Sequence, residues 1–260
     1  MPLTLSTDVH DSDFPALMAA CWEALEHPRE NFLYLCAPIL NGDRDASVAA
    51  SAARQLHLHK EAEQPIGSVW VKVVDTDKND KIVAGVRWVF YVRDHPFALK
   101  EGQEREQEQT PFRAEWWPEG PGREFATRAL WQLYEARARM ARRPQAFLHL
   151  IFVLPEYRRR GIGAQLLRWG LERADALGLE SWLDATDMGR PLYERHGYIA
   201  VRDHDLRPKR PEGLSEAEQA EWKRYEDELL PIHITTMWRP AGGKYEEGTT
   251  RKPWEEEAEK

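Results

Sequence analysis

The chain has 260 residues and a formal net charge of −8, with 42% hydrophobic and 31% charged residues. This length and composition predict a soluble globular protein of one large domain or two small ones. The acidic balance argues against a general nucleic-acid-binding protein, which would need a basic face. No stretch approaches the ~20 apolar residues of a transmembrane helix. The N-terminus also lacks the basic and apolar regions of a secretory signal.

The numbers and spacing of the cysteines and histidines indicate the cellular compartment and whether a metal site is expected. Cys21 and Cys36 cannot form a disulfide framework, so we expect a reduced, cytoplasmic or nuclear compartment. Cys21 lies within an apolar helical pattern and is interpreted as a small buried thiol. The histidines are scattered, and His57 and His59 lack carboxylate or cysteine partners at ligand spacing, so no metal site is expected.

In chain order, the first half of the sequence predicts strands and helices in alternation. A strand over 3–7 precedes a helix that begins at the capping residues 11–13 and ends near 26. A further helix over 44–63 is followed by a hairpin, with strands over 68–74 and 82–91 around the turn 75–80. A helix over 124–142 follows an insertion.

The insertion spans residues 93–122 and contains a charged run followed by Trp116 and Trp117 between two prolines. A loop of this length usually has a function or is disordered. The tryptophan pair could close over a substrate. Alternatively, both rings could pack against the helix that follows.

The second half predicts a mixed α/β fold around one sheet. Apolar residues favour a strand over 147–154, and residues 161–177 carry apolar side chains at helical spacing up to Gly178. Strands are expected over 179–185, 198–206 and 232–238, and a helix begins at the capping box of Ser215 and Glu218. Residues 1–240 would form a single domain, and the polar, glutamate-rich residues 241–260 are expected to be a mobile tail.

The loop after strand 147–154 predicts a phosphate site. Its sequence is Pro155-Glu156-Tyr157-Arg158-Arg159-Arg160-Gly161-Ile162-Gly163-Ala164, and it opens directly into a helix. Glycines allow close backbone approach, and the first N–H groups of a helix lack intrahelical partners and carry the positive end of its dipole. The segment has no lysine followed by a hydroxyl residue, as a P-loop requires, and the third glycine of a dinucleotide fingerprint is replaced by Leu166.

A second motif follows at a fixed distance. Residues 187–198 end in Leu192-Tyr193-Glu194-Arg195-His196-Gly197-Tyr198, one helix and one strand after the first motif. Together the Arg-x-x-Gly-x-Gly-Ala loop and the Leu-Tyr-x-x-x-Gly-Tyr ending resemble the GNAT superfamily of acetyl-coenzyme A-dependent acetyltransferases. The resemblance covers residues 65–200 best, and a fungal branch of the superfamily is the most similar.

The resemblance implies a mixed, mostly antiparallel central sheet flanked by helices on both faces. It implies that acetyl-CoA binds through its pyrophosphate to Arg158, Arg159, Arg160, Gly161, Ile162, Gly163 and Ala164. Tyr193 matches the family's general acid and coenzyme-contacting tyrosine. A backbone N–H near Phe152 or Val153 would bind the carbonyl oxygen, beside a splay between strands 146–153 and 179–185. Many members have asparagine where this chain has Thr186, whose hydroxyl still offers a hydrogen bond.

The chemistry assigns further roles. Transfer to an amine requires a neutral amine, a donor for the developing oxyanion and a proton for the thiolate. The phenol of Tyr193 can supply that proton, or its ring could simply pack in the core. His149 falls where some arylalkylamine N-acetyltransferases place a proton-relaying histidine. A packed core histidine, with a water chain as the base, is the alternative.

The expected function is therefore N-acetylation of a primary amine in a ternary complex. The acceptor could be a small molecule or a peptide or protein lysine, and the acidic surface is compatible with a cationic one. Neither nucleic acid nor membrane is expected as a partner, and the sequence does not indicate an oligomeric state. A non-catalytic acyl-CoA sensor or scaffold is the alternative function.

Overall fold

The structure is a computed structural model that describes residues 2–61, 67–93 and 113–255. Among these residues, seven strands form one sheet in the order β1-β2-β3-β4-β5-β7-β6, and every neighbouring pair is antiparallel except β4 with β5. The strands are β1 Leu3–Ser6, β2 Ser68–Asp75, β3 Lys81–Tyr91, β4 Gln145–Val153, β5 Glu180–Ala185, β6 Ile199–Asp205 and β7 His233–Arg239. The expected mixed, mostly antiparallel sheet is confirmed.

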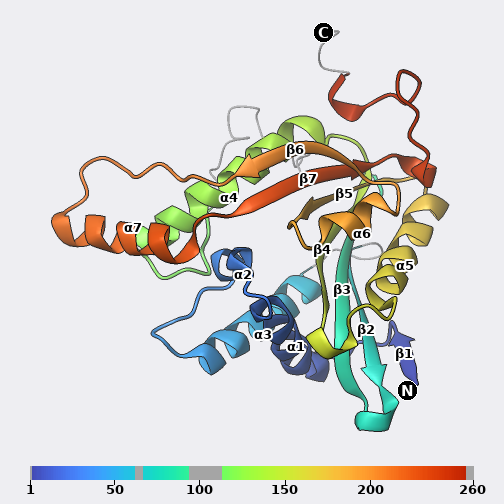
Figure 1. Ribbon diagram of the computed structural model, residues 1–260, viewed down its shortest axis with the longest axis horizontal. Coiled ribbons are helices and arrows are strands. Elements are labelled where there is room, and N and C mark those ends of the chain that lie inside the picture. The colour runs from blue at the N-terminus through green and yellow to red at the C-terminus, as the bar shows by residue number, and fades with distance from the viewer. Residues whose placement is uncertain (1, 62–66, 94–112, 256–260) are drawn as a thin grey trace.

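Helices lie on both sides of this sheet (Figure 1). They are α1 Phe14–Glu26, α2 Asn31–Cys36, α3 Arg44–Lys60, α4 Pro121–Met140, α5 Ile162–Ala176, α6 Arg190–Glu194 and α7 Glu216–Leu229. Helices α2 and α6 were not predicted from the sequence, because helices of 6 and 5 residues are too short to show a periodic pattern. The capping box at the start of α7 forms as expected, with Ser215 and Glu218 exchanging hydrogen bonds.

The main core holds β3 and β4 between α1 and α5. Gly170 on α5 lies directly against the indole of Trp88 on β3, at a distance that leaves no room for a Cβ atom. On the other face, Gly85 leaves space for the ring of Phe152 and for Leu17 of α1. Cys21 is buried in this core, as expected. These close contacts fix α5, and therefore the loop that precedes it, against the sheet.

The sheet divides at β4. Its parallel pairing with β5 extends only from Gln145 opposite Glu180 to Leu148 opposite Leu183. The rest of β5 pairs with β7 alone, while the rest of β4 keeps only β3 as a partner. A register shift in the β3–β4 pairing also leaves His149 as an extra residue at this point. The expected splay between the two strands is therefore present.

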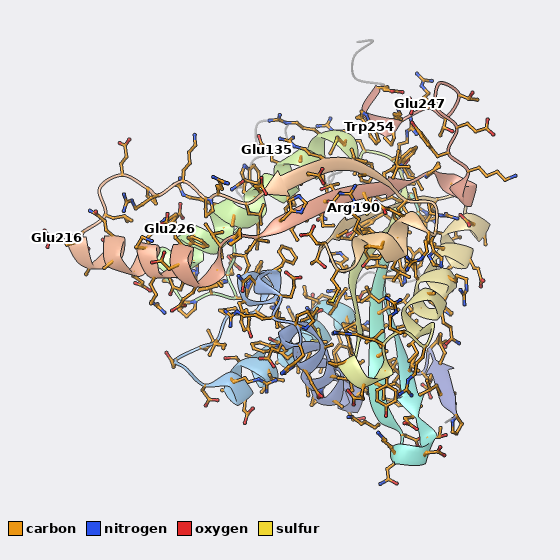
Figure 2. All side chains as sticks on the ribbon, viewed as in Figure 1. Glu135, Arg190, Glu216, Glu226, Glu247 and Trp254 are labelled. Carbon is orange, nitrogen blue, oxygen red and sulfur yellow. The ribbon has the colours of Figure 1, made fainter. Side chains whose placement is uncertain are left out.

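A second cluster of buried side chains lies between α2, α4 and α7. Trp117 belongs to it: its Nε1 donates to the carbonyl oxygen of Leu35 (2.9 Å) and its ring meets that of Tyr225 edge-on. Helix α7 projects from the body of the molecule, with Glu216 at its outer end (Figures 1 and 2). Trp117 thus takes the packing role that was the alternative to a lid.

The expected mobile tail from residue 241 is described as far as Glu255, and Tyr245 and Trp254 of this part pack against the sheet, while most of its other residues are exposed. The ring of Trp254, which is labelled in Figure 2, lies 5.4 Å from Trp238 of β7 and 5.9 Å from Trp182 of β5. Burial of aromatic area offsets the polar composition from which mobility was expected. Residues 256–260 lie outside the described residues.

Candidate active site

The loop between β4 and α5 has the geometry of an anion cradle. Arg159 and Gly161 adopt left-handed backbone angles, with φ of 62° and 79°. Such angles beside ordinary ones turn successive N–H groups toward a common point. The N–H groups of Ile162, Gly163 and Ala164, at the start of α5, donate to no acceptor among the described residues. They lie at the positive end of a 15-residue helix, where a phosphate is favoured.

Two side chains just before the cradle hold the loop in place. The buried hydroxyl of Tyr157 donates to the carboxylate of Asp75 at the end of β2 (2.7 Å). The guanidinium of Arg158 donates to the carbonyl oxygens of Val153 (3.1 Å), His27 and Ala24. Arg158 therefore caps the C-terminal end of α1 with its side chain.

Tyr193 lies across the cleft from the cradle, on α6. Its side chain is only 5% exposed, and no described residue hydrogen-bonds its hydroxyl group. Burial raises the pKa of this phenol well above its usual value of 10. Tyr193 is thus a protonated phenol that faces the cleft with its proton available. The nearby Thr186 hydroxyl accepts a long hydrogen bond from the N–H of Gly189 (3.4 Å).

The splayed end of β4 presents backbone N–H groups to the cleft. The N–H of Leu154 donates to the carbonyl oxygen of Val83 (2.9 Å), so it points toward β3. Because N–H directions alternate along a strand, the N–H of Phe152 also points to β3, and that of Val153 points to the side that β5 has left. Of the two residues named from the sequence, Val153 has the N–H in the position to bind a ligand.

His149 stands in the cleft beside this gap. Its ring meets that of Phe147 edge-on, with 4.6 Å between centroids. His149 is an exposed residue whose ring opens onto the cleft, where the cleft walls displace part of its solvent shell. This desolvation, with the positive charges of Arg87 and Arg137, holds the pKa of His149 well below its usual 6.5. The imidazole is therefore neutral at pH 7.

One cleft of about 2110 Å³ connects these groups. Its volume is about twice that of a large single-ligand pocket, so it has room for two ligands side by side. Most site residues expected from the sequence line it, and Arg160 and Trp117 do not. Those that do are Trp116, His149, Phe152, Val153, Arg158, Arg159, Gly161, Ile162, Gly163, Ala164, Thr186 and Tyr193. Arg160 instead donates to the carbonyl oxygen of Glu156 (2.7 Å).

Residues 19–198 match the family model described as "Acetyltransferase (GNAT) family". The chain belongs to this family. No curated protein matches its sequence. The family assignment agrees with the two motifs, since the matched region includes both the cradle and Tyr193.

Solved structures of GNAT proteins share the fold. The polyamine N-acetyltransferase of Drosophila melanogaster, which forms N-acetylagmatine, superposes with a TM-score of 0.51 at 14% identity, over 92% of this chain and all of that one. A Corynebacterium glutamicum structure described as histone acetyltransferase HPA2 and related acetyltransferase has a TM-score of 0.49 at 17% identity, over 93% and 97% of the two chains. A phosphinothricin acetyltransferase of Sinorhizobium meliloti, solved with acetyl-CoA, has a TM-score of 0.45 at 15% identity, over 97% and 94%.

Several charged residues in the cleft of this GNAT protein were missed by the sequence analysis. Arg137 of α4 contacts Asp184 of β5 (3.0 Å), and that carboxylate also accepts from the hydroxyl of Thr236 (2.8 Å). Arg54 of α3 and Arg87 of β3 line the same half of the cleft. Arg87 and Asp184 were detectable as single charges inside apolar strands. The helical arginines had no such signal, because charged residues are common on helix surfaces.

Metal-site clusters and membrane-spanning helices are both absent from the parts of the chain that the structure describes. No three side chains of His, Cys, Asp or Glu come together there in a possible metal site. Likewise, no helix in those ranges combines the length and apolar character needed to cross a bilayer.

Proposed function

We propose that the chain transfers an acetyl group from acetyl-CoA to a primary amine, by direct attack in a ternary complex. The observation that carries this proposal is the shared cleft. It holds unpaired amides at the mouth of α5, the hydroxyl of Tyr193 and the open edge of β4. We further propose that the chain belongs to a fungal branch of the family and that it acts inside the cell.

The residues of the cradle and its neighbours would bind the coenzyme. The N–H groups of Ile162, Gly163 and Ala164, with those of Arg159 and Gly161, would hold the diphosphate of the coenzyme, whose thioester supplies the acetyl group when bound. Arg158 supports this loop rather than contacting the phosphate with its guanidinium, which is occupied by carbonyl oxygens. Thr186 would offer its hydroxyl to the pantetheine arm.

At the reacting centre, the amine nitrogen attacks the thioester carbonyl carbon and the carbon–sulfur bond breaks. The N–H of Val153 would stabilise the negative charge that develops on the carbonyl oxygen. Tyr193 would pass its proton to the departing sulfur. The proton lost by the amine would leave through His149 or through a water chain.

Two measurements on the full-length protein test this proposal. Calorimetry with acetyl-CoA is expected to detect binding, and thiol release with a panel of amines and amino acids is expected to exceed hydrolysis without an acceptor. Absence of binding heat would overturn the coenzyme assignment. Binding without release for any acceptor would instead favour an acyl-CoA sensor.

The role of His149 has a specific pH signature. Since its pKa lies below 6.5, the neutral imidazole is available as a base above that pH, and protonation at lower pH removes it. His149→Gln is therefore expected to lower kcat/KM more at pH 7 than near pH 9.5, where more amine is already deprotonated. A loss of equal size across the pH profile would show that the ring only packs on Phe147.

A further inference from the structure

One arginine in the proposed acceptor half of the cleft is buried without a counter-charge from any described residue. Arg87 of β3 is 8% exposed. Its Nε donates to the hydroxyl of Ser68 (2.8 Å) and its Nη1 to the amide oxygen of Gln55 (2.9 Å). Both partners are neutral, Nη2 donates to no described residue, and no carboxylate among the described residues pairs with Arg87.

A second cation stands beside it. Arg54, one residue before Gln55 on α3, donates to the carbonyl oxygen of Cys36 (2.7 Å), and its guanidinium stacks over the ring of Trp116 (4.6 Å). It too has no ion pair with any carboxylate in the described ranges. Burial lowers the pKa of both side chains, and that of Arg87 falls to about 10 with a contribution from Arg54. Both remain charged at pH 7.

Two other arginines in the cleft, unlike Arg54 and Arg87, have their guanidinium groups compensated or fully occupied by protein partners. Arg137 is neutralised by Asp184, at 3.0 Å. Arg158 is occupied by three carbonyl oxygens. A buried charge without a partner is costly, and its usual compensation is an ion or ligand of opposite sign. Among the described residues, Arg54 and Arg87 are thus the two buried or half-buried arginines of the cleft whose charge no carboxylate offsets and whose guanidinium is not fully occupied by carbonyl oxygens.

The position of the pair links it to the acceptor. Arg87 pairs across the sheet with Leu150, next to the irregularity at His149 where β4 and β5 separate. It is close enough to His149 to depress the pKa of that imidazole. The cradle and Arg159, which would bind the coenzyme, lie on α5 and its preceding loop. A group held by Arg87 would therefore belong to the acceptor rather than to the coenzyme.

We propose that the acceptor amine carries a carboxylate close to its amino group, and that Arg87, with Arg54, binds this carboxylate. The inference rests on the proposed acetyl transfer and narrows its substrate class to amino acids and related amino carboxylates. A guanidinium can donate two parallel hydrogen bonds to a carboxylate. The net charge of −8, which is compatible with a cationic acceptor, describes the whole chain and not this wall of the cleft.

The test compares acceptors that differ only in the carboxylate: tyrosine with tyramine, and ornithine with putrescine. With the wild-type protein, the carboxylated member of each pair is expected to show a KM about 10- to 100-fold lower, the usual range for charge-assisted hydrogen bonds. Arg87→Gln is expected to bring the ratio of the two KM values to within about threefold of one. Arg54→Gln, outside the sheet, is expected to reduce the ratio as well.

Arg168→Gln is the matched control, because Arg168 is exposed on α5 and does not line the cleft, and the substitution removes the same charge. It is expected to leave the ratio unchanged. Calorimetry of the same acceptors with the protein saturated by coenzyme A separates the two proposals. Binding of amino acids without turnover would overturn acetyl transfer and keep the carboxylate site. Turnover that favours the amines, failure of every acceptor to bind, or a ratio insensitive to Arg87→Gln would overturn the carboxylate site.

Discussion

Tyr193→Phe is expected to lower kcat by about 10²- to 10⁴-fold, the range that a positioned general acid contributes. Its hydroxyl has no partner among the described residues, so phenylalanine leaves no unsatisfied group and keeps the ring contact with Tyr198. The affinity for acetyl-CoA and the thermal midpoint are expected to change little. Since burial raises the pKa of Tyr193, the wild-type protein is also expected to keep its acid protonated above pH 10. Steady-state kinetics measure the change in kcat and its pH dependence, and thermal unfolding measures the midpoint.

Tyr198→Phe is the matched control for this substitution. Tyr198 is equally buried, and the two rings lie 5.9 Å apart, but its hydroxyl pairs with the hydroxyl of Ser181. The control is expected to cost about 1 kcal/mol of stability through the lost hydrogen bond, with little change in kcat. Similar kcat values for the two variants would remove Tyr193 from the acid role.

Gly161→Val is expected to weaken acetyl-CoA binding by at least about tenfold. The backbone of Gly161 has φ of 79°, a conformation that costs a residue with a Cβ atom about 1–2 kcal/mol and a β-branched residue more. Relief of this strain would turn the amides of the cradle away from a common anion. Calorimetry with acetyl-CoA reports the loss directly.

Gly178→Val separates the cradle from general strain. Gly178 follows the other end of α5, has φ of 67°, and like Gly161 has nothing within 4 Å of an added Cβ atom. Both variants are expected to lose comparable stability, while only Gly161→Val loses coenzyme affinity. Equal affinities for the coenzyme in the two variants would place the diphosphate elsewhere.

The regular elements were predictable because each carries a local pattern. The apolar spacing on α5, the alternation in β2 and β3 and the capping box of α7 all lie within about twenty residues of sequence. Helices α2 and α6 were not predictable, because helices this short are not long enough to show a periodic pattern. The packing of residues 241–255 was also missed, because Trp254 meets Trp182 and Trp238 only after the sheet has formed.

The two halves of the candidate site also differ in how far apart their residues lie in the sequence. The proposed coenzyme half comes from two short segments, so the cradle from Arg159 to Ala164 and Tyr193 could be named before the fold was known. The acceptor half combines Arg54 of α3, Arg87 of β3 and Arg137 of α4. Only the fold shows that Arg137 is neutralised by Asp184 and that Arg87 has neutral partners.

Short segments of sequence were enough to predict the family, the anion-cradle loop and Tyr193 as the acid candidate, because these depend on backbone angles and on residue spacing within each segment. The fold was needed to show which N–H groups of β4 face the cleft, where Trp117 packs and which arginines have no counter-charge among the described residues. Strand register and charge pairing join residues far apart in the chain, and no local pattern encodes the partner that each side chain meets.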